Sequence, residues 1–332
     1  MSITEIPGIK VGHATDLEAI TGCTVVLCED GAVAGVDQRG GGPGTRETAL
    51  LNPVNHVQKA HAILLAGGSA FGLDAAAGVM RYLEEKDIGY QTGVARVPIV
   101  PAAILYDLNI GDAQRRPDAE MGYQACQNAS SQPPDQGSVG AGTGATVGKL
   151  LGMTQATKSG IGTACIEIGG GIKVGAIVAV NAIGDVINPE NGQIVAGARS
   201  VRKGPLKIGQ DGLFADSLTI MRSLVGRPLF SLADRANTII GVVATNAGFD
   251  KAEITKVAQM AQNGSVRCAR PSNTMHDGDT IFALSTGKKK ANVNLVGAFA
   301  AQAVQQAILN AIEAAESLGG VPAVRDLTTG SD

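Results

Sequence analysis

Short apolar segments of strand length alternate with amphipathic helical segments along the 332 residues, and this alternation limits the fold more than any other feature. Since strands and helices are intermixed, with helices enough to cover sheets from outside, we expect an α/β fold of the layered αββα sandwich type. The sequence predicts one domain over residues 1–332. Strands are predicted over residues 22–28, 61–66, 94–100, 170–182, 238–244 and 280–284, and helices over residues 71–85, from 250 onward and over 295–315.

The composition supports a large core, because 44% of the residues are hydrophobic and 17% are charged. The net charge of −3, the aromatic content of 3% and the absence of Trp disfavour nucleic-acid binding. Residues 1–13 lack the basic and apolar regions of a signal peptide, and no apolar run reaches membrane-spanning length. We therefore expect a cytoplasmic protein with no nucleic-acid or membrane partner.

The cysteines and histidines give no sign of a metal site. The five cysteines are widely spaced and odd in number, which favours reduced, buried thiols. The four histidines form neither an H-E-x-x-H motif nor a cluster with cysteine. We expect no metal and no cofactor, so any hydrolysis needs a nucleophile from the protein itself.

A polar Asn237–Thr238 pair directly precedes the most strand-like segment of the chain. If the bond between these residues were cut, Thr238 would gain a free α-amine, whose ordinary pKa is about 7.7–8.0. This amine could serve as general base for the hydroxyl of the same residue, as in enzymes with an N-terminal threonine nucleophile. The competing interpretation is a threonine that simply favours the β-conformation.

Two acidic residues, Asp277 and Asp279, flank a glycine just before the strand predicted at 280–284. In an extended segment their carboxylates would lie on one face and could orient the amine and hydroxyl of Thr238. The alternative is a solvated Asp-Gly turn. A calcium loop is disfavoured, because the spaced oxygen ligands and closing Glu of that motif are missing.

Other glycine-rich motifs suggest structure rather than catalysis. Residues 67–72 do not form a nucleophile elbow, because the second glycine falls one position late, and Ser69 is expected to cap a helix. Residues 40–46 lack the Lys-Ser/Thr of a phosphate-binding loop and are expected to form a tight loop, with Arg46 bordering a substrate cleft. His276 lies beside Asp277, but no serine is placed to complete a triad.

Four motifs together resemble the family of self-processing D-aminopeptidases and β-peptidyl aminopeptidases, and within it the nylon-hydrolase branch. They are RANTIIGVVATNAGF at 235–249, PSNTMHDGDTIFALSTG at 271–287, LLAGGSAFGLDAAAGV at 64–79 and GSVGAGTGATVGK at 137–149. The resemblance covers most of the chain and implies an N-terminal-nucleophile hydrolase. It also implies self-cleavage after Asn237 into chains 1–237 and 238–332, which assemble as a tetramer of processed heterodimers.

The resemblance assigns roles to individual residues. It implies that Thr238 is the nucleophile, that Asp277 and Asp279 position it, and that the amide of Asn181 donates to an oxyanion. It further implies that a lysine and a tyrosine line the site, and these are Lys149 and Tyr106. Without the resemblance, Lys149 would be an exposed turn residue, Tyr106 a core tyrosine and Asn181 a strand-end residue.

Departures from the family pattern bear on the substrate. The chain has Ile239 after Asn-Thr where many relatives have a second threonine, which leaves the nucleophile intact. The aminopeptidase branch more often uses a serine nucleophile with a Ser–Glu pair, so Thr238 with two aspartates favours the nylon-hydrolase branch. Peptide N-termini, β-peptides, D-amino-acid amides and 6-aminohexanoate oligomers all remain candidate small substrates.

Three other functions compete with this one. An ornithine-acetyltransferase-like enzyme would also use a threonine nucleophile but would pass the acyl group to an amine, and the DGDT motif at 277–280 argues against it. A non-catalytic oligomeric scaffold would keep the fold without self-cleavage. A nucleotide-binding module is the weakest alternative, because no phosphate-binding motif is complete.

Overall fold

Strand β2 (Thr21–Gln38) is the longest strand and belongs to both halves of the central sheet. Its first part pairs with β1 (Lys10–Asp16) and β4 (Lys59–Ala66), and its last part pairs with β16 (Thr280–Lys289). The pairing with β4 shifts register between Leu27 and Ala32, where the strand passes from one half to the other. The computed structural model describes residues 1–201, 208, 212–223 and 237–327.

The main sheet has nine strands in the order β10-β11-β14-β16-β2-β4-β7-β3, with β1 added on β2. Its remaining members are β3 (Thr45–Arg46), β7 (Ala102–Ile104), β10 (Ile161–Glu167), β11 (Lys173–Asn181) and β14 (Thr238–Ala247). The smaller strands are β5 (Tyr90–Gln91), β6 (Arg96–Val97), β8 (Thr146–Val147), β9 (Thr157–Lys158), β12 (Asp185–Ile187), β13 (Ile194–Ala196) and β15 (Ala269–Arg270).

The two halves of the sheet pack face to face around one apolar layer. Ile63 and Leu65 of β4 share this layer with Ile177 of β11, Ile240 of β14 and Phe282 of β16. All five side chains are at most 1% exposed. Alternate residues of the same strands point to the outer faces, as the two-residue period of a strand requires.

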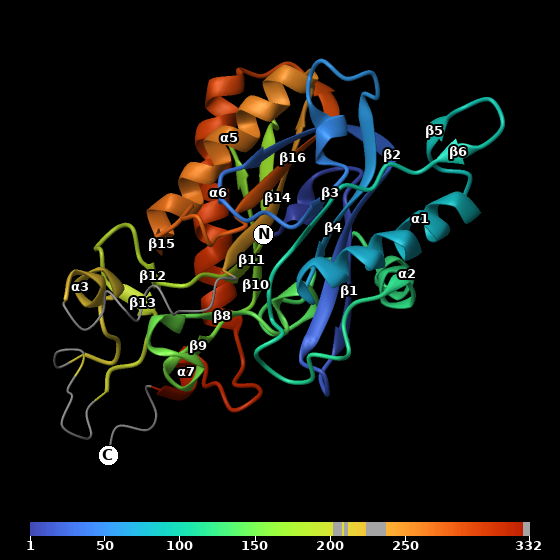
Figure 1. The fold of residues 1–332 in the computed structure, drawn as a ribbon. Helices are drawn as coiled ribbons and strands as arrows, with labels where there is room; N and C mark the ends of the chain where they lie inside the picture. Colours follow the sequence, from blue (N-terminus) through green and yellow to red (C-terminus); the bar gives the residue numbers. More distant parts are fainter. Residues whose placement is uncertain (202–207, 209–211, 224–236, 328–332) are drawn as a thin grey trace.

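Helices cover both outer faces (Figure 1). Helices α5 (Lys251–Cys268) and α6 (Val293–Ala314) pack on the β10-β11-β14-β16 half, and α1 (Ala75–Glu85) and α2 (Ala119–Gln127) pack on the β1-β2-β4 half. The order of layers is therefore helix, sheet, sheet, helix, which confirms the predicted αββα sandwich. Shorter helices are α3 (Ser217–Arg222), α7 (Val324–Leu327), and the 3-10 turns η1 (Ile3–Glu5), η2 (Thr48–Leu51), η3 (Ser69–Asp74), η4 (Gly140–Gly142), η5 (Lys149–Leu151) and η6 (Met153–Gln155).

Most predicted elements are present. The strands predicted at 61–66, 170–182 and 238–244 are β4, β11 and β14, and those predicted at 22–28 and 280–284 are the first parts of the longer β2 and β16. Helix α5 begins with a capping box, in which Asp250 accepts from the Glu253 N–H and Glu253 accepts from the Asp250 N–H.

Two local predictions are wrong. Residues 94–100 do not form a core strand, because Val94 lies at the tip of the β5–β6 hairpin with 97% of its surface exposed, and the core strand that follows is β7. Ser69 is not a helix cap. It is the first residue of η3, has a positive φ of 55°, and η3 has no side-chain cap.

Helix α6 is long and apolar enough to span a membrane, and it is the one such helix among the described residues. Its contacts with α5, β10 and β11 explain this composition, because 56% of its most apolar window is buried inside the protein. It is a core helix by its packing.

Candidate active site

Thr238 is the first residue of β14, and its side chain lies between two neighbouring strand ends. On one side it is directly opposite Asn181, the last residue of β11. On the other side lies Gly278, where an added Cβ atom would be 3.0 Å from the Thr238 hydroxyl oxygen. Thr238 is 5% exposed and Asn181 is fully buried. The register of the sheet thus brings together segments separated by dozens of residues.

The hydroxyl of Thr238 is directed at the carbonyl group that precedes it. Its Oγ1 donates to the Asn237 carbonyl oxygen at 2.5 Å. The Gly278 N–H donates to the same oxygen at 2.8 Å. A backbone N–H bound to a carbonyl oxygen draws electrons from that group and stabilises negative charge on the oxygen. The bond predicted to be cut is therefore held beside a hydroxyl group and a backbone N–H donor.

Asp279 fixes the backbone on the other side of Thr238. Its two carboxylate oxygens accept from the N–H groups of Ile239, at 2.7 Å, and Asn273, at 2.9 Å. Asp277 instead accepts from the Thr274 N–H at 2.6 Å, within its own loop. Asp279 thus reaches the residue after Thr238 through a backbone N–H group.

The pKa values of both Asp277 and Asp279 are raised. Burial raises the pKa of Asp279 to about 7, and the neighbouring charge of Asp277 adds to this effect against the two N–H donors. Burial also raises the pKa of Asp277, while the positive charge of Lys149 opposes the rise. Because the charge of each carboxylate disfavours ionisation of the other, the two titrate as a coupled pair.

Lys149 and Asn181 form one hydrogen-bonded unit. The Lys149 Nζ donates to the Asn181 carbonyl oxygen at 2.8 Å and to its side-chain Oδ1 at 2.9 Å. The Thr146 N–H donates to the same Oδ1 at 3.1 Å. The Asn181 Nδ2 donates to the backbone carbonyl of Tyr106 at 2.8 Å. Lys149 is 3% exposed, so it is not the solvated turn lysine of the alternative interpretation.

The six predicted site residues therefore lie in one region, although Tyr106 reaches Asn181 through its backbone carbonyl. Lys149 connects the two halves of the group, since it binds Asn181 and its charge acts on Asp277. Sequence reasoning missed Gly278, whose N–H binds the Asn237 carbonyl. The glycine between two aspartates in the DGDT motif is the signal that could have identified it.

The glycine loop after β2 closes over the acidic segment. The Arg39 N–H donates to the Asp279 carbonyl at 3.0 Å, and the Gly42 N–H donates to the Asp277 carbonyl at 2.9 Å. At Gly40 an added Cβ would lie 2.0 Å from the Asp277 carbonyl oxygen, so only glycine fits there. Arg46 instead donates to the sulfur of Met80 at 3.1 Å, and the backbone of the glycine loop is what borders the acidic segment.

Among the described residues, no group of three His, Cys, Asp or Glu side chains is arranged to hold a metal ion. The five cysteines are all buried and free of disulfides. Burial raises the pKa of Cys28 to about 12, and it raises the pKa of Cys126 and of Cys268 to about 12 as well. These thiols are held in the protonated form, which is a poor nucleophile.

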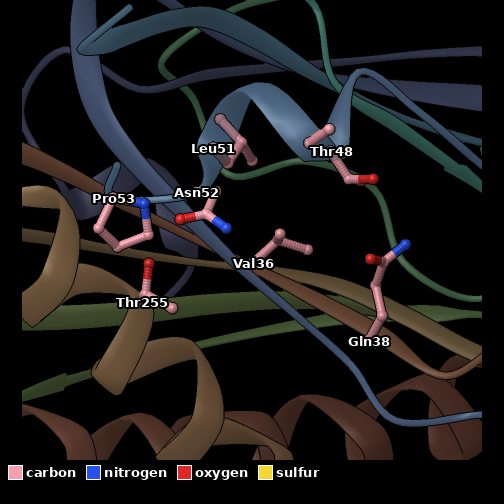
Figure 2. Close-up of a pocket in the computed structure, with 8 residues that line it drawn as sticks. Val36, Gln38, Thr48, Leu51, Asn52, Pro53 and Thr255 are labelled. Atoms are coloured by element: carbon pink, nitrogen blue, oxygen red, sulfur yellow. The ribbon is translucent and has the colours of Figure 1, made fainter. Parts of the chain in front are cut away.

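A separate cavity of about 350 Å³ lies beside the last residues of β2. Figure 2 shows Thr48, Leu51 and Asn52, from the η2 segment, above Val36 and Gln38 of β2. Its lining is completed by Ala49, Pro53 and Thr255. These lining residues carry no charge and include none of the predicted site residues, so the cavity is distinct from the group around Thr238.

Comparison with known proteins identifies one matching family. The model of peptidase family S58 matches residues 1–325. An uncharacterized aminopeptidase of Mycobacterium leprae is 42% identical, with 97% of this chain and 92% of that protein covered. A 6-aminohexanoate-oligomer endohydrolase of Kocuria sp. is 31% identical, with 92% of this chain and 84% of that protein covered.

Solved structures support the same fold. The L-aminopeptidase D-Ala-esterase/amidase of Ochrobactrum anthropi, described as a variant of the Ntn hydrolase fold, superimposes with a TM-score of 0.71 at 21% identity, covering 97% of this chain and 88% of that one. A β-aminopeptidase of Burkholderia sp. gives a TM-score of 0.66 at 21% identity, covering 99% of this chain and 93% of that one.

Proposed function

The chain belongs to peptidase family S58 and is a hydrolase of amide bonds, and from this premise we propose that it cleaves itself and then uses Thr238 as an N-terminal nucleophile. The observation that carries the proposal is the contact between the Thr238 hydroxyl and the Asn237 carbonyl, 2.5 Å between the oxygen atoms. The N–H of Gly278 on the same carbonyl oxygen supports it.

Self-cleavage proceeds in two steps. The Thr238 Oγ attacks the carbonyl carbon of Asn237, while Gly278 N–H stabilises the oxygen that becomes negative. The bond from that carbon to the Thr238 nitrogen breaks, the hydroxyl proton ends on the nitrogen, and an ester joins the two residues. Water then hydrolyses the ester, which leaves Asn237 with a carboxylate and Thr238 with a free α-amine.

Substrate hydrolysis repeats the chemistry on an external amide. The amine of Thr238 accepts the hydroxyl proton as Oγ attacks, since an α-amine with a pKa of about 7.7–8.0 is partly neutral near pH 7.5. The Nδ2 of Asn181 donates to the oxyanion, and the proton passes to the leaving amine. Water releases the acyl group from Oγ and restores the free enzyme.

The charged residues hold this geometry. Asp279 binds the N–H of Ile239 and so fixes the backbone next to the nucleophile. Lys149 binds Asn181 and offsets the charge of Asp277. The new α-amine forms in a region that contains both carboxylates, which favour its protonated state between catalytic steps. We propose Asp277, Asp279, Lys149 and Tyr106 as the residues that line and position the site.

The proposed substrate is a small peptide-like amide or a 6-aminohexanoate oligomer. The oligomer is supported by the relative named 6-aminohexanoate-oligomer endohydrolase, at 31% identity. Aminopeptidase action on D-, L- or β-peptides is the second candidate, because the relative from Mycobacterium leprae is named an aminopeptidase. A panel of a 6-aminohexanoate oligomer, D-alaninamide and L-alanine p-nitroanilide separates the two. Adding an amine acceptor tests for acyl transfer of the acetyltransferase kind.

The two chains made by self-cleavage are proposed to remain one domain. The small chain, 238–332, contains β14 and β16, and these strands lie between β11 and β2 of the large chain, 1–237. Separation would break two strand pairings and expose the layer between the sheets. We also propose that processed pairs assemble further as a homo-oligomer, a tetramer by the family resemblance, in the cytoplasm. Native mass measurement tests the assembly.

Intact mass and activity of a Thr238→Ala variant test the proposed function. We expect wild-type protein to give two chains that divide between Asn237 and Thr238, and the variant to stay at full length and be inactive on the panel. Thr238→Ser, which keeps a hydroxyl, should still be cleaved. Normal processing of Thr238→Ala, or full activity of an uncleaved wild-type chain, would show that Thr238 is not the nucleophile.

A further inference from the structure

Two further buried charged residues, Asp107 and Lys158, lie in or beside segments that contact Asn181. Asp107 is 2% exposed and Lys158 is fully buried. The Asp107 carboxylate accepts from the Gly68 N–H at 2.7 Å and from the Thr21 hydroxyl at 2.8 Å. Burying charges in the interior costs free energy unless they are paired and hydrogen-bonded, so their presence calls for a reason.

The Lys158 ammonium group donates three hydrogen bonds, all to backbone carbonyls. Its Nζ donates to the carbonyl oxygens of Gly142 at 3.2 Å, Ala145 at 3.0 Å and Ser159 at 2.5 Å. An ammonium group has three hydrogens to donate and no acceptor site. Three carbonyl partners therefore match the charged form of Lys158 and hold the loop of residues 142–145 from one side.

Two glycines make room for the Asp107 carboxylate. An added Cβ at Gly67 would lie 2.1 Å from the Asp107 Oδ2, and one at Gly144 would lie 2.6 Å from the same atom. These glycines belong to the motifs at 64–79 and 137–149, and the proposed chemistry uses neither of them. The backbone of both motifs closes around one carboxylate, and a side chain at either position would displace it.

Each charge holds a segment that contacts the Asn181 side chain. Asp107 directly follows Tyr106, whose carbonyl accepts from the Asn181 Nδ2. Lys158 holds the carbonyl of Ala145, which directly precedes Thr146, and the Thr146 N–H donates to the Asn181 Oδ1. Both ends of the Asn181 amide are thus fixed through neighbours of the charge pair. One Nδ2 hydrogen binds Tyr106, and the other has no acceptor among the described residues.

We infer that Asp107 and Lys158 are paired positioning residues that fix the Asn181 amide, so that its second Nδ2 hydrogen is ready for the oxyanion of the substrate. The inference rests on the proposed function, because it gives Asn181 that role. The pair acts on substrate turnover and not on self-cleavage, since the Asn237 carbonyl is bound by Gly278 and the Thr238 hydroxyl.

Each of the two charges favours the charged form of the other residue. The positive charge of Lys158 lowers the pKa of Asp107, which burial raises to about 6. The negative charge of Asp107 raises the pKa of Lys158, which burial lowers to about 7. Removal of either charge thus favours the neutral form of the other, and Lys158 in its neutral form loses one of its three donated bonds.

The test compares two rates in the same variants. In Asp107→Asn and in Thr21→Val, which removes a donor to Asp107, we expect kcat of the mature enzyme to fall about tenfold with KM within about twofold, because a misplaced oxyanion donor acts on the transition state. The substrates are a 6-aminohexanoate oligomer and L-alanine p-nitroanilide. Self-cleavage, followed by intact mass after cell-free synthesis, should stay within about twofold of wild type.

Lys251 supplies a matched control for Lys158. It is 3% exposed and also donates to three carbonyls, those of Leu50, Asn55 and Val57, at the start of α5. We expect Lys158→Met to lower kcat, while Lys251→Met affects thermal stability and leaves kcat near wild type. Because Lys158→Met can fail to fold, Asp107→Asn and Thr21→Val decide the outcome.

Two results would overturn the inference. Either kcat stays at the wild-type value in both Asp107→Asn and Thr21→Val, or self-cleavage and kcat fall together, as general loss of structure would cause. Failure of the proposed function gives a different result, since Thr238→Ala would then be processed or active whatever the Asp107 variants do. A Thr238→Ala chain that stays uncleaved, together with a fully active Asp107→Asn enzyme, would remove only the present inference.

Discussion

Asn181 and Thr238 are directly opposite each other at the ends of β11 and β14. Directly opposed residues of antiparallel strands point to the same face, with Cβ atoms about 4.5–5.5 Å apart. The amide proposed to bind the oxyanion and the hydroxyl proposed to attack are therefore neighbours because of strand register, and a shift of one residue would separate them.

Gly278→Ala is expected to slow self-cleavage. The new Cβ would lie 3.0 Å from the Thr238 hydroxyl oxygen and 3.1 Å from the Gly42 carbonyl oxygen, so the hydroxyl must move from its place at the Asn237 carbonyl. Misplacement of a reacting atom by a fraction of an ångström to one ångström can cost about 10- to 100-fold in rate. Intact mass over time after synthesis measures the rate. Cleavage at the wild-type rate in a normally folded variant would contradict this prediction.

Lys149→Met is expected to move the acidic limb of the pH–rate profile to higher pH. The charge of Lys149 lowers the pKa of Asp277, so its loss lets burial raise that pKa further, and Asp277 becomes protonated at a higher pH. The profile of kcat/KM on mature enzyme measures this limb. Lys149→Arg, which keeps the charge, is the control and should leave the limb near its wild-type position, even if kcat falls. An unmoved limb in Lys149→Met would rule out the electrostatic role.

Asp277→Asn is expected to flatten the dependence of stability on pH. The pKa of Asp279 is raised to about 7 from an ordinary 3.8, so its contribution to stability is fully present below pH 3.8 and is lost as the pH rises through about 7. Removal of the Asp277 charge lowers the pKa of Asp279. Each decrease of one unit in that pKa recovers about 1.4 kcal/mol of the free energy of unfolding at high pH.

The measurement uses Thr238→Ala as background, so that the chain stays intact. Thermal unfolding at pH 5 and pH 8 should show a larger loss of Tm at pH 8 in the background protein than in the variant that also carries Asp277→Asn. Equal losses in the two proteins would mean that the charge of Asp277 does not act on Asp279.

Gly40→Ala is expected to destabilise the protein, and Gly42→Ala is the matched control in the same loop. At position 40 the new Cβ would lie 2.0 Å from the Asp277 carbonyl oxygen, whereas at position 42 the nearest atom is 3.7 Å away. Overpacking of this kind costs about 1–3 kcal/mol. Thermal unfolding should give a lower Tm for Gly40→Ala and a nearly unchanged Tm for Gly42→Ala. Similar Tm values for both would show that the loop moves away freely.

The local elements of the fold could be predicted because their signals are local. The apolar run from Thr238 onward predicts β14, and the Asp250–Glu253 capping box predicts the start of α5. The strand predicted at 94–100 failed for a tertiary reason. Its apolar residues lie partly in an exposed hairpin, with Val94 97% exposed, and no periodic pattern reveals whether a segment packs on the core.

The sequence by itself determined the layered α/β class, the Asn-Thr pair before a strand and the acidic pair beside a glycine, because each depends on residues that are close together in the chain. Only the tertiary structure placed Gly278 and Asn181 on either side of Thr238. These partners are separated by tens of residues and are brought together by the register of β11, β14 and β16. Register is fixed by the packing of a whole sheet between two layers, which no local pattern specifies.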